Sequence, residues 1–185
     1  MPQKNKEAAL GVADRKAASV KAQIQHITRE GKKQPSNDNK KVGNTFERDL
    51  CLSLSGYGFW AHNLAQNSQG QPFDVLAAKD GKPYPIDCKV CEKNIFKMER
   101  IEENQALAMM LWRETGNGEG WFALKLNNGE VFFLTFSLLE ELSLTKHALS
   151  ESEIRRYGVT LGKWVSQCES ESETRSGLPS PTPKC

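Results

Sequence analysis

The pattern of apolar and polar positions predicts a folded α/β domain between two polar ends. In the middle of the chain, apolar residues recur at helical spacing in some stretches and gather in short extended runs in others. Glycine-containing turns separate these segments. The predicted order is one helix, three strands, a second helix and two strands, then shorter helices, over residues 44–56, 57–64, 72–89 (two strands and their turn), 98–114, 121–126, 131–136, 138–142 and 150–165.

This order is typical of a mixed sheet, here of five strands, flanked by helices. No Gly-rich phosphate loop, Ser-His-Asp arrangement or internal repeat occurs in the sequence. We expect three parts: a basic arm over residues 1–41, disordered or loosely helical; a folded domain over 42–165; and a disordered Ser-, Glu- and Pro-rich tail over 166–185.

The charge is small overall but unevenly distributed. The net charge is +2, yet lysines and arginines crowd the first 41 residues with few acids between them. A basic arm suggests contact with phosphate groups, and the alternative is a solvated extension without a partner. No secretory signal or membrane-spanning run is visible, so we expect a cytoplasmic protein with five reduced cysteines. Cys88 and Cys91 form one C-x-x-C pair, but no further ligands follow at zinc-site spacing.

The candidate chemistry lies in the segment from Pro72 to Lys89. Two short apolar runs flank Asp80-Gly81, a dipeptide that favours a hairpin turn. Asp74 lies on the first run, and Asp87 and Lys89 lie two positions apart on the second, so they share a face. In a suitable register Asp74 joins them.

Two neighbouring carboxylates repel, and each raises the pKa of the other. A hard divalent cation such as Mg²⁺ removes this conflict and is commonly held by one or two carboxylates. The alternative is a surface hairpin with a solvated Asp–Lys pair. Glu47 lies in the first turn of the first predicted helix, where the helix dipole favours a carboxylate. The functional alternative for Glu47 is a third carboxylate near the metal.

The order of Glu47, Pro72-Phe73-Asp74 and Asp87-Cys88-Lys89 resembles the PD-(D/E)XK nuclease superfamily. Within it, the chain is most similar to RecU-type Holliday junction resolvases and their phage relatives. The resemblance covers roughly residues 42–142, and its supporting segments are Gly43–Glu47, Phe96–Ile101, Asn104-Gln105, Gly120–Leu124 and Glu130–Leu134.

This resemblance implies a restriction-endonuclease-like core and metal-dependent hydrolysis of DNA phosphodiesters. It implies that Asp74 and Asp87 hold Mg²⁺ or Mn²⁺, that Glu47 completes the acidic shell, and that Lys89 contacts the attacking water or the scissile phosphate. Gln105 matches the glutamine of the second-helix motif and would orient the site or touch phosphate. Its alternative role is a hydrogen bond to the sheet edge.

Two departures from RecU-type enzymes are visible. Asp87 stands where those proteins usually carry glutamate, and the segment between Glu47 and Asp74 is too short for their stalk. The first hypothesis is a homodimeric Holliday junction resolvase that acts on branched DNA in recombination, repair or phage DNA processing. The alternatives are a non-catalytic nucleic-acid-binding module of the same fold and a restriction-type endonuclease.

Overall fold

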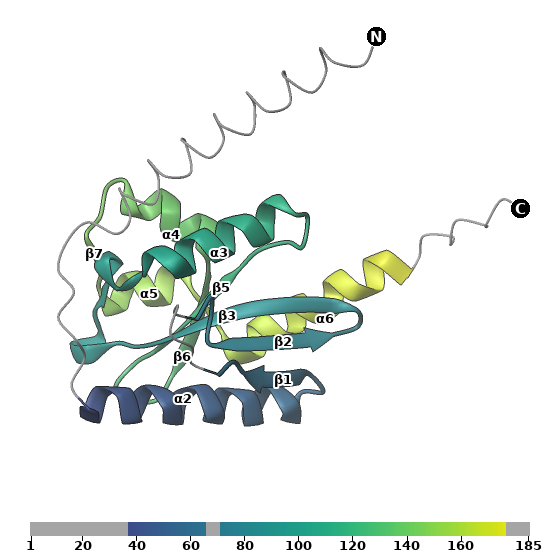
Figure 1. Ribbon diagram of the computed structural model, residues 1–185, viewed down its shortest axis with the longest axis horizontal. Helices are drawn as coiled ribbons and strands as arrows, with labels where there is room; N and C mark the ends of the chain where they lie inside the picture. Colours follow the sequence, from purple (N-terminus) through teal and green to yellow (C-terminus); the bar gives the residue numbers. More distant parts are fainter. Residues whose placement is uncertain (1–36, 66–70, 177–185) are drawn as a thin grey trace, which may run out of the picture.

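The protein is built around one mixed six-stranded sheet (Figure 1). The structure, a computed structural model, describes residues 37–65 and 71–176. The strand order is β1-β2-β3-β5-β6-β8, with a parallel pair at β3 and β5 and antiparallel pairs elsewhere. The bounds are β1 (Trp60–Asn63), β2 (Val75–Lys79), β3 (Lys82–Val90), β5 (Trp121–Lys125), β6 (Val131–Thr135) and β8 (Val159–Thr160).

The mixed sheet flanked by helices is confirmed, but the predicted number of five strands is wrong. The sixth strand, β8, has only two residues and pairs with β6 through Phe132↔Thr160 and Phe133↔Val159. A two-residue strand carries no alternating pattern, so the sequence gives no sign of it. A second small sheet pairs β4 (Phe96–Lys97) with β7 (Ala148–Leu149).

Helices cover both faces of the sheet (Figure 1). On one face, α2 (Asn37–Gly56) and α6 (Leu161–Ser176) enclose an apolar cluster that contains Leu54 and Trp164. On the other face, α3 (Glu103–Glu114), α4 (Phe136–Ser143) and α5 (Glu151–Tyr157) enclose a second cluster. Two short 3₁₀ turns, η1 (Glu92–Asn94) and η2 (Met98–Arg100), lie between β3 and α3.

The predicted hairpin is confirmed. Asp80 and Gly81 both have positive φ angles, 53° and 73°, as a two-residue type I′ turn requires. This turn sets the register Val75↔Ile86 between β2 and β3. The amide of Asp74 donates to the carbonyl of Ile86 at 3.1 Å, which continues the pairing by one residue. Asp74 therefore lies just before β2, beside the part of β3 that carries Asp87.

Several helix boundaries differ from those that the sequence predicted, and the predicted segment 150–165 is divided into α5, β8 and the start of α6. Helix α2 begins at Asn37, and α3 begins at Glu103 because η2 occupies the preceding residues. Thr135, not Ser137, caps α4 by accepting from the amide of Leu138.

Helix α6 continues through residues 166–176, where we expected a tail without regular structure. Most of the basic arm lies outside the described residues, and the division into arm, domain and tail stays a prediction. Among the described helices, none has the length and apolarity needed to cross a membrane.

Candidate active site

Asp74, Asp87 and Lys89 lie together on the face of the sheet that α3 covers. Their neighbours Tyr84, Ile86 and Cys88 belong to the apolar cluster under α2 and α6, so the alternating positions of β3 face the other way. Lys89 Nζ lies 2.8 Å from Asp87 Oδ1, and the amide of Cys88 donates to Asp74 Oδ2 at 2.7 Å. The hairpin therefore brings together the residues that the sequence singled out.

Asp87 is fully buried, and this burial dominates its chemistry. Burial raises the pKa of Asp87 to about 7; the charge of Lys89 opposes the shift, and Asp74 adds to it. Apart from the ion pair between Oδ1 and Lys89, neither carboxylate oxygen of Asp87 has a hydrogen-bond partner within residues 37–65 and 71–176. Burial also raises the pKa of Asp74, against the opposing effects of Lys89 and the Cys88 amide.

Lys89 is held as a charged group between two acceptors. Burial lowers the pKa of Lys89, but the charges of Asp87 and Asp74 outweigh it and leave this pKa raised. The ammonium also donates to Gln105 Oε1 at 3.0 Å. Lys89 is therefore protonated and fixed in direction at neutral pH.

Gln105 lies in the first turn of α3 and connects the helix to the site. Its Oε1 accepts from the backbone amide of Glu102 at 3.3 Å as well as from Lys89, within a capping box formed by Glu102 and Gln105. The hydrogen bond to Lys89 on β3 fits both the predicted orienting role of Gln105 and its alternative role as a partner of the sheet, so its role stays a prediction. Glu102, whose charge raises the pKa of Asp87 and of Asp74, was not predicted from the sequence. The Glu-x-x-Gln pattern at the helix start was the available signal.

Glu47 reaches the site from α2, in the opposite helix layer. Burial and then the charge of Asp74 raise the pKa of Glu47. Asn63 Nδ2, at the end of β1, donates to Glu47 Oε2 at 3.2 Å, and Cys51 Sγ donates to Asn63 Oδ1 at 2.9 Å. Asn63 was not predicted from the sequence, because only strand pairing brings it beside the helix.

The donor set suits a divalent cation, although it is not a preassembled cluster. Among the described residues, no group of three or more His, Cys, Asp or Glu side chains is arranged to hold a metal ion. Lys89 occupies one side of Asp87, and Asn63 holds Glu47. However, the charge of Asp74, just before β2, acts on Asp87 on β3, and Asp87 Oδ2 is a buried oxygen without a partner among the described residues. Oxygen donors of this kind are the ligands that Mg²⁺ and Mn²⁺ prefer.

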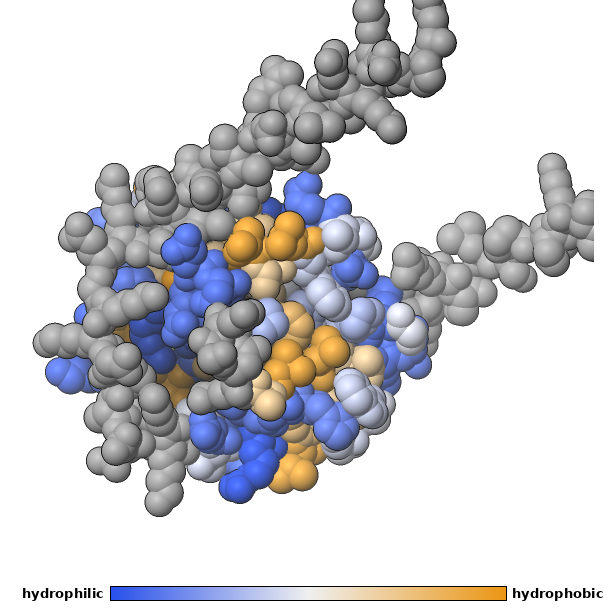
Figure 2. All heavy atoms as spheres, in the orientation of Figure 1, coloured by the Kyte–Doolittle hydropathy of each residue, from blue (hydrophilic) through white to orange (hydrophobic). Residues whose placement is uncertain are grey.

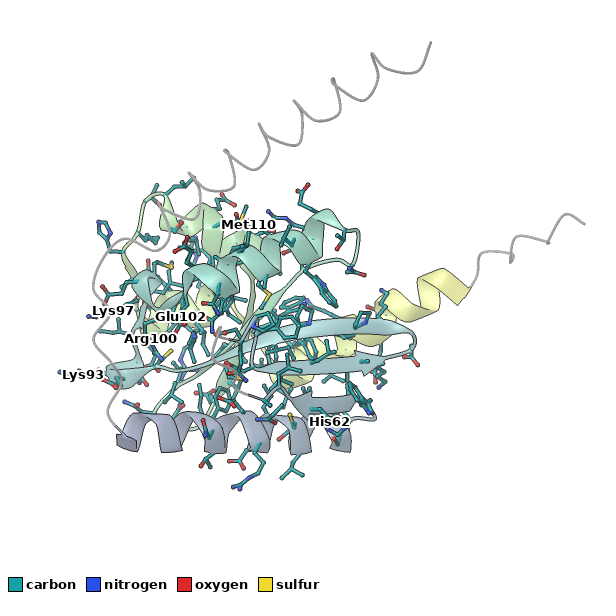
Figure 3. All side chains as sticks on the ribbon, viewed as in Figure 1. His62, Lys93, Lys97, Arg100, Glu102 and Met110 are labelled. Carbon is teal, nitrogen blue, oxygen red and sulfur yellow. The ribbon has the colours of Figure 1, made fainter. Side chains whose placement is uncertain are left out.

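Basic side chains follow the site along the chain. Figure 3 shows Lys93, Lys97 and Arg100 near Glu102, in the segment between β3 and α3. Arg100 donates to the carbonyl of Val90 at 2.5 Å, and Lys97 pairs with Glu99 at 3.3 Å. These cations lie on the segment that connects β3 to α3, between Lys89 and Gln105 in the sequence.

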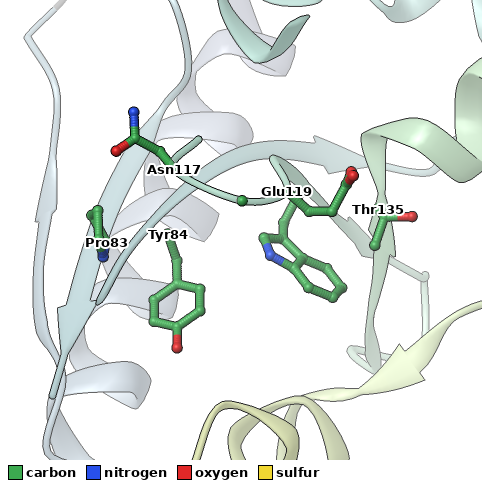
Figure 4. Close-up of a pocket in the computed structure, with 7 residues that line it drawn as sticks. Pro83, Tyr84, Asn117, Glu119 and Thr135 are labelled. Atoms are coloured by element: carbon green, nitrogen blue, oxygen red, sulfur yellow. The ribbon is translucent and has the colours of Figure 1, made fainter. Parts of the chain in front are cut away.

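A separate pocket of about 370 Å³ lies toward the beginning of β3 (Figure 4). None of the candidate site residues lines it, so it is distinct from the carboxylate site. Its lining residues are Pro83, Tyr84, Asn117, Gly118, Glu119, Trp121 and Thr135.

Comparison with known proteins agrees with this fold. Residues 38–172 match the model of the family described as archaeal Holliday junction resolvase (Hjc). The structure is similar to that of Hjc from Archaeoglobus fulgidus, a Holliday junction resolvase from an archaeal hyperthermophile. The TM-score is 0.51 at 23% identity, over 68% of this chain and 96% of the other. No curated protein matches the sequence significantly.

Proposed function

Because the chain belongs to the family of archaeal Holliday junction resolvases (Hjc), we propose that it is a divalent-metal-dependent endonuclease that cuts branched DNA. The observation that carries the proposal is the grouping of Asp74, Asp87 and Lys89, in which the charge of Asp74 acts on Asp87 and Lys89 lies 2.8 Å from Asp87. The predicted PD-(D/E)XK superfamily agrees with this membership. The narrower likeness to RecU-type and phage enzymes, and a role in recombination, repair or phage DNA processing, remain part of the proposal.

The roles of the site residues follow from their positions. Asp74 and Asp87 would hold Mg²⁺ or Mn²⁺, and Glu47 would complete the acidic shell from α2. A bound cation would lower the pKa of a coordinated water and neutralise charge on the phosphate. Lys89, held by Gln105 at 3.0 Å, would bind a phosphate oxygen or orient the attacking water. Hydrolysis adds this water to phosphorus and breaks one P–O bond.

We further propose that the enzyme acts as a homodimer. A four-way junction is resolved by two cuts, and two-fold symmetry places one site on each of two strands. A DNA substrate also agrees with the cytoplasmic location that we expect from the sequence.

A cleavage assay tests the proposed function directly. A labelled four-way junction and a linear duplex of the same sequence are incubated with the protein in Mg²⁺. We expect preferential cutting of the junction, and a loss of about 10²–10³-fold in rate for Asp74→Ala and Asp87→Asn, the range seen when one stabilising group is removed. Asp49→Asn, an exposed acid of α2, is the matched control and should leave the rate unchanged.

The outcomes separate the alternatives. Salt-sensitive DNA binding without cleavage would favour a non-catalytic module of the same fold. Equal cutting of both substrates at fixed sequences would favour a restriction-type nuclease. Full activity in Asp74→Ala would contradict the assignment of the site.

A further inference from the structure

One aromatic pair lies on the same sheet face as the carboxylates but has no role in the site described above. The rings of Trp60 and His62 on β1 lie 4.4 Å apart, tilted by 47°. Trp60 is 57% exposed, the highest value among the aromatic side chains described as exposed. Ala61 between them is buried against α2, so both rings face away from that helix.

Strand register places these rings beside the site. Trp60 pairs with Ala78 and His62 with Leu76, while the amide of Leu64 donates to the carbonyl of Asp74 at 2.8 Å. Positions two apart on a strand share a face, so Trp60 and His62 face the same side as Asp74. Trp60 then lies about four residues along the strand from Asp74, or about 13 Å. This distance corresponds to about four base-pair steps of DNA.

Among the described residues, apolar side chains form the face of β2 and β3 beside the rings. It consists of the partly exposed side chains of Leu76 and Ala78 on β2 and Pro83 on β3. Apolar side chains are visible in the space-filling view where β1 and β2 lie (Figure 2). Helix α3 covers the carboxylate end of this face, as the contact between Lys89 and Gln105 shows, and leaves the rings exposed. We call Trp60, His62, Leu76, Ala78 and Pro83 the aromatic shelf.

The composition of the shelf selects one kind of occupant. A duplex backbone is bound by cations, which the shelf lacks, whereas an unpaired base presents a flat ring that stacks on aromatic side chains. Bases at a branch point can leave their stacks at lower cost than bases inside a duplex. A second copy of this chain is less suited, because β1 has only four residues for edge pairing.

We propose that Trp60, supported by His62, stacks on an unpaired base at the branch point and gives the enzyme its preference for branched over linear DNA. This inference rests on the proposed function, because it takes the carboxylate face as the DNA-binding face. The shelf binds a base near the scissile phosphate and makes no direct contribution to hydrolysis.

Binding measurements test this proposal with the full chain in Ca²⁺, which occupies oxygen sites while allowing binding to be measured without Mg²⁺. Fluorescence anisotropy gives the affinity for a labelled four-way junction and for a linear duplex. We expect Trp60→Ala to weaken junction binding about 10-fold, within the range for removal of one base-stacking ring, and to leave duplex binding unchanged. Trp60→Phe should retain junction binding. Tyr57→Ala, which removes another exposed aromatic side chain, is the matched control.

Each other outcome overturns the proposal in a recognisable way. Equal loss of junction and duplex binding would make Trp60 a general DNA contact, and unchanged binding would leave it without a role. A change in the sedimentation mass of the DNA-free protein on Trp60→Ala would identify the shelf as a protein interface. If the wild-type protein binds neither the junction nor the duplex, both the proposed function and this inference are wrong. If the wild-type protein cleaves the junction and Trp60→Ala binds it equally well, only this inference is wrong.

Discussion

At the scale of single residues, burial determines the charge state of Asp87. Its carboxyl is buried completely, and its pKa rises from 3.8 to about 7 because burial disfavours the charge. Between pH 3.8 and about pH 7, Asp87 keeps its proton in the folded protein but has released it in the unfolded chain. For this group, the stability of the metal-free fold is therefore greatest below pH 3.8 and falls as the pH rises to about 7. Lys89, whose pKa is raised, keeps its proton throughout that window.

The pH dependence of cleavage follows from the raised pKa of Asp87. A cation must displace the proton, so at subsaturating Mg²⁺ the rate should rise about tenfold per pH unit below neutrality and level off above about pH 7. Because metal and proton compete, a higher Mg²⁺ concentration should move the midpoint to lower pH. Initial rates on a labelled junction at several metal concentrations measure this. A midpoint near pH 4 that does not change with the Mg²⁺ concentration would contradict this prediction.

Asn63 is expected to position Glu47 for the metal. Cys51 donates to Asn63 Oδ1, which leaves the amide nitrogen of Asn63 facing Glu47. Removing such a supporting hydrogen bond typically weakens metal affinity about 10–100-fold. We therefore expect Asn63→Ala to weaken Mn²⁺ binding by at least about 10-fold, measured by calorimetry. Asn128→Ala, in the turn before β6, is the control. Unchanged Mn²⁺ affinity in Asn63→Ala would show that Glu47 needs no such support.

These residues also show what the sequence could reveal about the site. Asp74, Asp87 and Lys89 lie on one hairpin, so strand periodicity and the Asp80-Gly81 turn were enough to bring them together. Asn63 lies on β1 and contacts Glu47 on α2, the helix packed against the sheet. No local sequence pattern predicts that contact. The burial that raises the pKa of Asp87 was equally hidden, because it depends on how α3 packs over β3.

At the scale of elements, α6 was the least expected part of the fold. The Ser- and Glu-rich composition after Val165 predicted a tail, but the helix continues, and Cys168 is buried against the sheet together with Trp164 and Val165. Their spacing places them on one side of a helix, and this short apolar stripe was the signal available. Strong local signals, such as the Asp-Gly turn and the Gly56 helix end, predicted their elements well. Short elements such as β8, which depend on tertiary packing, were missed.

Trp164 should account for much of the stability of the core under α2 and α6. Its ring is fully buried and stacks on Phe133 at 4.6 Å and on Phe59 at 5.4 Å. We expect Trp164→Ala to lower the free energy of unfolding by about 3–5 kcal/mol, the usual range for removing a buried aromatic side chain. Urea denaturation followed by circular dichroism measures the loss. Lys163→Ala, at the exposed neighbouring position, should unfold like the wild type. A loss no larger than that of the control would mean that α6 adds little to the fold.

At the scale of the whole molecule, paired cleavage requires two sites in a fixed relation. Helix α3 can provide that relation, because Gln105 on its inner side contacts Lys89 while Leu107 and Leu111 are exposed on its outer side. These leucines are one helical turn apart, at 39% and 56% exposure. Apolar side chains gather over α3 in Figure 2. An exposed apolar stripe of this kind is typical of an interaction surface.

We therefore expect α3 to form the contact between two copies of the chain. A contact through α3 would hold each Gln105 at a set distance from its counterpart and so orient the two sites together. Leu111→Asp introduces a charge into that contact and should shift the sedimentation mass from dimer to monomer. On a four-way junction, the same variant should give single nicks in place of paired cuts. Leu52→Asp, at a 66% exposed leucine on α2, is the control and should stay dimeric. If Leu111→Asp keeps the dimer mass and still gives paired cuts, the dimer interface lies on another surface. That other surface would then fix the relative positions of the two sites.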